Sequence, residues 1–93
     1  MPHFVVMGWF RPGADDAVVP LQPQLNDQLA YRPLRLAGLM RDAEGRPRGW
    51  VGVLEDDSLE AARTFLEHSP YLQSGLYERA EVYAYSIEVG RLD

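Results

Sequence analysis

The sequence contains neither lysine nor cysteine, so each of its 9 basic residues is an arginine. Without lysine, the chain cannot form a Schiff base or use the lysine of a phosphate-binding P-loop. Without cysteine, it has no thiol nucleophile, no disulfide and no zinc–thiolate site. The absence of cysteine also fits the cytoplasm, where thiols are kept reduced, and we expect a cytoplasmic protein.

Positive charge is scarce as well, because the 9 arginines face 14 acidic residues and leave a net charge of -5. An acidic surface repels phosphate backbones, which argues against nucleic acid as a partner. The apolar residues 1–10 are too few to span a membrane and lack the basic flank of a signal peptide. His3 and His68 have no further ligands at metal-binding spacing, so we expect no metal site and no cofactor.

The hydrophobic content of 46% is enough for a globular core, and the 93 residues are predicted to form one domain spanning 1–93. Four runs are rich in β-branched and aromatic residues and predict strands: 3–10, 32–40, 48–54 and 77–89. The polar segment 41–47 joins the two middle runs as a hairpin loop, in which Gly45 is available for a positive φ. In the last run, small residues alternate with Tyr83 and Tyr85, so its two faces differ.

Two segments between these runs predict helices. Residues 15–31 hold the first helix, whose start the pattern leaves open, and Pro20 could occupy its first position. The recurrence of leucine every four residues predicts a buried stripe of Leu21, Leu25 and Leu29, with Gln28 outside it.

The second helix is predicted from residue 59 to about residue 68. Either Asp57 or Ser58 can cap its start, and Glu60 lies three residues after Asp57, at the spacing of a capping box. Pro70 forces the preceding residue out of helical geometry and is predicted to end the helix.

The resulting order, β-α-β-β-α-β, predicts an α+β fold of the ferredoxin-like type, with an antiparallel sheet and both helices on one of its faces. No strand shows clean polar alternation, so the second face of the sheet should be apolar too. A large apolar face is unfavourable in water. We therefore predict a homodimer that stacks two such sheets face to face.

Residues 57–85, which read D-S-L-E-A-A-R-T-F-L-E-H-S-P-Y-L-Q-S-G-L-Y-E-R-A-E-V-Y-A-Y, resemble the C-terminal half of YciI-like (YCII-related) proteins. In that family a "SLEEA" helix leads into an Asp-Pro-Tyr corner, a Gly-aromatic turn and a final strand. Segments 36–40 and 49–54 resemble the family's second and third strands. The resemblance implies a dimeric α/β barrel, in which two ferredoxin-like sheets pair, with a pocket between sheet and helices.

The resemblance also implies where an acid–base pair would lie, and the sequence departs from the family there. Some members are thought to use a His near the start of the first helix, in an Arg-Pro-x-His pattern, with the Asp that begins the corner. Here Ser69 stands in place of that Asp. Matching Pro20 to the family proline puts Gln22 at the His position and Val19 at the Arg position, whereas an ungapped count back from residue 40 puts Leu21 at the His position. Gln and Ser form hydrogen bonds but do not exchange protons near neutral pH.

We therefore assign no catalytic residue and expect a candidate pocket of Gln22, Ser69, Tyr71, His68 and Trp9. Tyr71 could donate a hydrogen bond to a ligand or wedge the corner against the sheet. His68 could replace the missing His or interact with the helix dipole as a C-terminal residue. Trp9 could line an aromatic pocket or fill the dimer core.

These residues leave two hypotheses for function. In the first, the chain is a homodimer without the His–Asp pair that binds a small molecule or acts as an accessory domain, without catalysis. In the second, it is a cofactor-independent enzyme, such as an isomerase, dehydrochlorinase or monooxygenase, acting on a small aromatic or lactone substrate. A filled space between Gln22, Ser69 and Tyr71 favours the first, whereas an open pocket with convergent polar groups favours the second.

Overall fold

The computed structural model describes residues 2–90, so Met1 and residues 91–93 of the predicted 1–93 domain lie outside the described residues. The elements succeed one another along the chain in the predicted order, with both helical segments broken into shorter pieces. They are β1 (His3–Phe10), α1 (Asp15–Leu21), the 3₁₀ helix η1 (Gln22–Leu25), α2 (Asn26–Leu29), β2 (Leu34–Arg41), β3 (Pro47–Glu55), α3 (Leu59–Glu67), α4 (Pro70–Gln73) and β4 (Tyr77–Tyr85).

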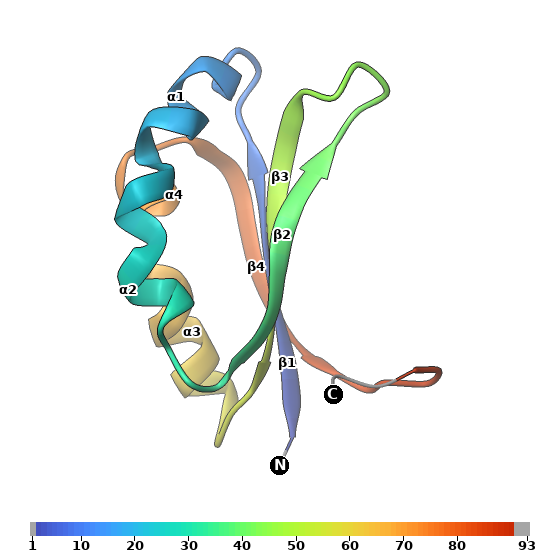
Figure 1. Cartoon of the computed structure of the whole chain (residues 1–93). Coiled ribbons are helices and arrows are strands. Elements are labelled where there is room, and N and C mark those ends of the chain that lie inside the picture. The colour runs from blue at the N-terminus through green and yellow to red at the C-terminus, as the bar shows by residue number, and fades with distance from the viewer. Residues whose placement is uncertain (1, 91–93) are drawn as a thin grey trace.

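The four strands form one sheet in the order β2-β3-β1-β4, and every neighbouring pair is antiparallel. All helices pack against one face of this sheet, and within residues 2–90 no element covers the other face (Figure 1). This arrangement confirms the predicted ferredoxin-like α+β fold with its helices on one side.

Alternation along the strands separates the two faces of the sheet. Phe4, Val6 and Phe10 of β1 point towards the helices and are buried. They pack in one core with residues from β3 and the helices, including Trp50, Leu54, Val18, Leu25, Ala62, Phe65 and Leu66.

The face away from the helices has an apolar centre, whereas a wholly apolar face was predicted: Glu81 pairs with Met7 and Arg79 with Trp9 on this face. Val5 pairs with Val53 on one side and Tyr83 on the other, and Val53 also pairs with Leu36, so all four share this face. Leu36 is 58% exposed and Tyr83 is 51% exposed. Trp9 and Trp50 lie on opposite faces, because only Trp50 belongs to the buried core.

Two prolines divide the first helical segment. Pro20 lies inside α1 instead of at the first helical position, so that prediction is wrong, and Pro23 lies at the start of η1. Neither residue has an N–H to donate to the preceding turn. The chain tightens between them, and the N–H of Gln22 bonds to the carbonyl of Val19, three residues back.

The predicted leucine stripe is wrong at its end, because Leu29 is 54% exposed while Gln28 is buried. Each step of four residues overshoots the helical turn of 3.6 residues, so three leucines at this spacing drift off one face. Steps of three and four stay on it, and the inward-facing positions are Val18, Leu21, Leu25 and Gln28.

Ser58 caps α3 by accepting a hydrogen bond from the N–H of Ala61 at 3.1 Å, so Ser58 and not Asp57 is the cap. Pro70 separates α3 from the next helix, as predicted, but it also begins that helix, α4, to which it contributes a suitable first residue. β4 ends at Tyr85 and not at Val89. Tyr85 pairs with His3, and because His3 is the first residue of β1, the pairing of the two strands ends there. Gly45 has the expected positive φ of 81° in the hairpin.

Candidate functional site

The structure separates the five predicted pocket residues into three places. Gln22 begins η1, Ser69 caps α4 and Tyr71 lies within α4, with the side chain of Gln22 near the Tyr71 hydroxyl. His68 is exposed at the C-terminal end of α3. Trp9 points to the face without helices, where its ring lies 4.0 Å from the guanidinium carbon of Arg79. Trp9 therefore cannot join the other four in one pocket.

Tyr71 lies in a filled aromatic cluster, called here the tyrosine cluster, made of Phe10, Ser69, Tyr71 and Tyr77. Tyr71 is 1% exposed and meets Phe10 edge-on, with ring centroids 5.2 Å apart, while Tyr77 stacks on Phe10 at 5.4 Å. The Tyr77 ring lies directly over Gly8, where a Cβ atom would overlap it. The rings therefore occupy the space that Ser69 and Tyr71 were predicted to line.

The two phenols of this cluster are buried hydrogen-bond donors. Within the described residues neither the Tyr71 hydroxyl nor the Tyr77 hydroxyl makes a hydrogen bond of standard geometry, although the side chain of Gln22 lies near the first and that of Ser69 near the second. Burial raises the pKa of both phenols, opposed by the nearby side chain of Gln22 for Tyr71 and of Ser69 for Tyr77. Ser69 itself caps α4, with its Oγ accepting from the N–H of Leu72 at 3.4 Å. The cluster is thus neutral and closed, and it presents no base.

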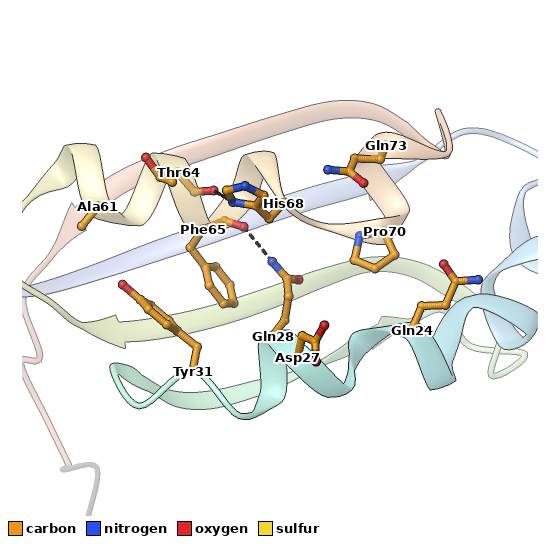
Figure 2. Close-up of a pocket in the computed structure, with 10 residues that line it drawn as sticks. All are labelled: Gln24, Asp27, Gln28, Tyr31, Ala61, Thr64, Phe65, His68, Pro70 and Gln73. Carbon is orange, nitrogen blue, oxygen red and sulfur yellow. Dashed lines mark hydrogen bonds between the residues drawn. The ribbon is translucent and has the colours of Figure 1, made fainter.

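An open groove lies elsewhere in the helical layer, between α2 on one side and α3 and α4 on the other (Figure 2). We call it the helix groove, and its volume is about 790 Å³. It is lined by polar side chains around an aromatic pair: Gln24, Asp27, Gln28, Tyr31, Ala61, Thr64, Phe65, His68, Pro70 and Gln73. A groove of this size with a few polar groups has the dimensions of a small-molecule site.

Three of the lining side chains have fixed hydrogen bonds to the carbonyls of α3. Gln28 Nε2 donates to the Phe65 carbonyl at 2.7 Å, as drawn in Figure 2, and Gln73 Nε2 donates to the Glu67 carbonyl at 3.2 Å. His68 Nδ1 lies 2.9 Å from the carbonyl of Thr64. Because a carbonyl oxygen only accepts, this nitrogen carries the proton, and Nε2 of the neutral ring is an acceptor.

Tyr31 closes one end of the groove through a buried carboxylate. Its hydroxyl donates to Asp56 Oδ2 at 2.7 Å, and Asp56 Oδ1 accepts from the N–H of Asp57 at 2.8 Å. The bond to Asp56 raises the pKa of Tyr31 to about 12, with burial adding to the effect. The Tyr31 ring also stacks on Phe65, with centroids 5.2 Å apart. The Tyr31 ring is therefore held by its hydrogen bond to Asp56 and by its contact with Phe65.

What the groove leaves unpaired is an acceptor. Gln28 is 7% exposed, and its Oε1 is buried without a partner in the part of the chain that the structure describes. Buried polar atoms of this kind are uncommon and call for an explanation. In the same described part there is no cluster of three or more metal-binding side chains. The groove can thus bind and orient a hydrogen-bond donor with its own side chains.

Of the described residues that line the helix groove, only His68 was among the predicted pocket residues. Gln28 was placed outside the buried stripe, although its spacing of three from Leu25 and ten from Val18 gives the signal that would have found it. Tyr77 was interpreted only as the start of the last strand. Its place over Gly8 depends on pairing between distant strands, which no local pattern reveals.

No protein-family model and no curated protein sequence matches the chain. Solved structures do match, and they belong to the dimeric α/β barrel superfamily. One is TftG, a 5-chloro-2-hydroxyhydroquinone dehydrochlorinase from Burkholderia phenoliruptrix AC1100, in complex with 2,5-dihydroxybenzoquinone. It has a TM-score of 0.79 and 18% identity, over 90% of this chain and 93% of that chain.

A second similar structure is SnoaB, a cofactor-independent oxygenase from Streptomyces nogalater, with a TM-score of 0.56 and 17% identity over 96% of this chain and 94% of that chain. A third is an antibiotic biosynthesis monooxygenase, with a TM-score of 0.56 and 18% identity over 94% of this chain and 98% of that chain. At these identities the likeness establishes the fold alone. The chain therefore has the ferredoxin-like fold of these proteins, and its function has to be argued from its own residues.

Proposed function

We propose that this chain is a cytoplasmic, YciI-like homodimeric domain that binds a small molecule in the helix groove and has no catalytic role. The observation that carries the proposal is that one candidate region is filled with side chains and another is open. Aromatic rings fill the region around Ser69 and Tyr71, whereas the open volume of the layer lies beside Gln28 and His68. The YciI-like assignment rests on the resemblance of residues 57–85, and the whole of 1–93 is proposed to be one such domain.

The homodimer is supported by the bare face of the sheet. Leu36, Tyr83 and Tyr85 are all exposed there, beside Val5 and Val53. Burying this surface against a second copy would remove it from water.

Among residues 2–90, none of the helices has the length and apolar character that crossing a membrane requires.

Sedimentation equilibrium tests the dimer with a matched pair of variants. Leu36→Arg places a charge on the bare face and should yield monomers. Leu29→Arg makes the same change at an equally exposed leucine, on the helical layer, and should leave the dimer intact. A monomeric wild-type chain, or equal effects of the two variants, would overturn the proposed interface.

A fragment screen read by thermal shift and by NMR tests ligand binding in the groove. Thr64→Trp puts a large ring into the groove from α3, whereas Glu60→Trp puts the same ring on an exposed position of α3 that does not line it. Binding of the screen's hits should disappear in Thr64→Trp and persist in Glu60→Trp. A screen without hits, or hits that Thr64→Trp leaves unchanged, would remove the support for this function.

A second candidate function is a cofactor-independent enzyme acting on a small aromatic or lactone substrate. It is favoured by the acceptor nitrogen of His68, which can take a proton from a bound substrate, and by the dehydrochlorinase and oxygenase among the similar structures. Release of chloride from 5-chloro-2-hydroxyhydroquinone by the purified chain is the test. Activity should vanish in His68→Ala and remain in His3→Ala. Absence of turnover in the wild type would eliminate this candidate for that substrate.

A further inference from the structure

Hydrogen bonds within the protein orient four side chains of the helix groove: Gln28 donates to Phe65, Gln73 to Glu67, His68 to Thr64 and Tyr31 to Asp56. These bonds direct acceptor atoms away from the carbonyls of α3, although each amide keeps a second N–H and Gln24 and Thr64 also line the groove. The two amides offer their oxygens, and the neutral imidazole offers Nε2.

The buried member of this set is the strongest acceptor for a ligand to satisfy. Gln28 Oε1 is shielded from water and has no partner among the described residues, while the Nε2 of the same amide is held by Phe65. Water therefore does not compete for this oxygen. A donor that reaches this oxygen from the groove completes its hydrogen bonding.

The charge of the groove wall and of the whole chain also favours a ligand that donates hydrogen bonds. Asp27 is the charged side chain on the groove wall, and no arginine is among the described residues that line it. The whole chain carries a net charge of -5. A carboxylate or phosphate in the groove would thus meet the like charge of Asp27. A protonated amine would meet acceptors and an opposite charge, and it carries only donors.

The apolar wall sets the shape of the ligand. The Tyr31 and Phe65 rings are stacked with an interplanar angle of 25° and form one side of the groove. Phe65 is 6% exposed and also stacks with Trp50, so an aromatic ligand would contact this wall through the half-buried Tyr31 ring.

From these observations we propose that the helix groove selects flat aromatic amines in their protonated form and rejects aromatic carboxylates. The inference rests on the proposed small-molecule site and adds its ligand class. The ammonium group lies against Gln28, His68 and Asp27, and the ring lies against Tyr31.

Titration calorimetry with three probes that share one ring system tests this selectivity: tryptamine, tryptophol and indole-3-acetate. The ring is constant, while the side group changes from a cationic donor to a neutral donor to an anion. We expect tryptamine to bind most tightly, tryptophol next, and indole-3-acetate at least about tenfold more weakly than tryptamine. Equal or tighter binding of indole-3-acetate would overturn the inference, and so would absence of binding by all three probes.

Variants locate the effect in the groove. Asp27→Asn should weaken tryptamine binding about two- to fivefold, as expected for an exposed charge pair, and leave tryptophol unchanged. Asp16→Asn changes the net charge equally on α1, outside the groove, and should leave tryptamine binding unchanged. Equal effects of the two variants would show that the net charge alone attracts the amine, against the inference.

Gln28→Met removes the buried acceptor with a side chain of similar length and should weaken tryptamine and tryptophol about tenfold or more. If this variant does not fold, Asp27→Asn and the probe series still decide the matter. The inference and the proposed function fail differently. Tight binding of indole-3-acetate that Thr64→Trp abolishes would overturn the ligand class and keep the site, whereas a fragment screen without groove hits would remove the site itself.

Discussion

The tyrosine cluster and the helix groove share one helical layer, but the cluster buries hydrogen-bond donors whereas the groove buries an acceptor. The cluster holds two buried donors, the Tyr71 and Tyr77 hydroxyls, in a space that rings fill. The groove holds a buried acceptor, Gln28 Oε1, beside open volume. The space next to a polar group, more than its place in a motif, thus determines whether it can serve a ligand.

Gly8→Ala should have the largest effect on stability, because it disturbs the packing of the tyrosine cluster. A methyl group at this position overlaps the Tyr77 ring, so the ring or the strand must move. We expect the free energy of unfolding to fall by about 3 kcal/mol, measured by urea denaturation. Gly38→Ala is the control when both variants are made in the Leu36→Arg chain, which should be monomeric: nothing within the chain lies within 4 Å of the added atom, and its effect should be within about 0.5 kcal/mol. Similar effects of the two variants would mean that the cluster is loosely packed.

Tyr31→Phe should weaken the groove wall next. It removes the donor that serves the buried carboxylate of Asp56. A hydrogen bond to a charged group is worth about 2 kcal/mol, so the urea midpoint at neutral pH should fall by that equivalent. An unchanged midpoint would show that Asp56 finds another donor.

Tyr71→Phe makes the same chemical change in the closed cluster and should have the smaller and opposite effect. The hydroxyl makes no hydrogen bond of standard geometry within the described residues, so its removal takes away a desolvation cost. We expect stability to stay constant or to rise by up to about 1 kcal/mol in the same assay. A loss comparable to that of Tyr31→Phe would mean that the Tyr71 hydroxyl is bonded in solution, for which the side chain of Gln22 is the nearest candidate.

Alkaline unfolding provides the finest test, because several tyrosines contribute to it. The pKa of Tyr31 is raised from 10.0 to about 12, so the unfolded chain loses this proton first. The stabilisation is fully present below pH 10 and is lost as the pH rises towards about 12. Burial raises the pKa of Tyr77 in the same direction. Wild-type stability should thus decline above pH 10, and Tyr31→Phe should decline less steeply. Parallel curves would contradict the Tyr31–Asp56 bond.

Much of the fold could be predicted from local patterns. Alternation in the last run predicted that its two faces differ, with Tyr83 and Tyr85 on one of them, and the serine before α3 was one of two possible caps. Helical phase was harder, because the leucine spacing of four misplaced Leu29 and hid Gln28. Strand length also depended on the partner, since β4 ends where β1 runs out of residues to pair with.

The candidate site was less accessible to sequence reasoning. The helix groove is built from residues far apart in the chain, such as Gln28 and His68, and its open volume is a property of how α2 packs beside α3. Whether a polar atom is paired also depends on rotamers and tertiary neighbours, as the two ends of the Gln28 amide show. No periodicity in the sequence carries this information.

The most direct measurement is a map of ¹H–¹⁵N NMR shift changes on adding tryptamine to the isotope-labelled protein. We expect the side-chain amide of Gln28 and the backbone amides of Thr64 and His68 to shift, with Gly8 and Tyr77 unaffected. Shift changes confined to Gly8, Tyr71 and Tyr77 would contradict the proposal, because they would place the ligand in the tyrosine cluster instead of the helix groove.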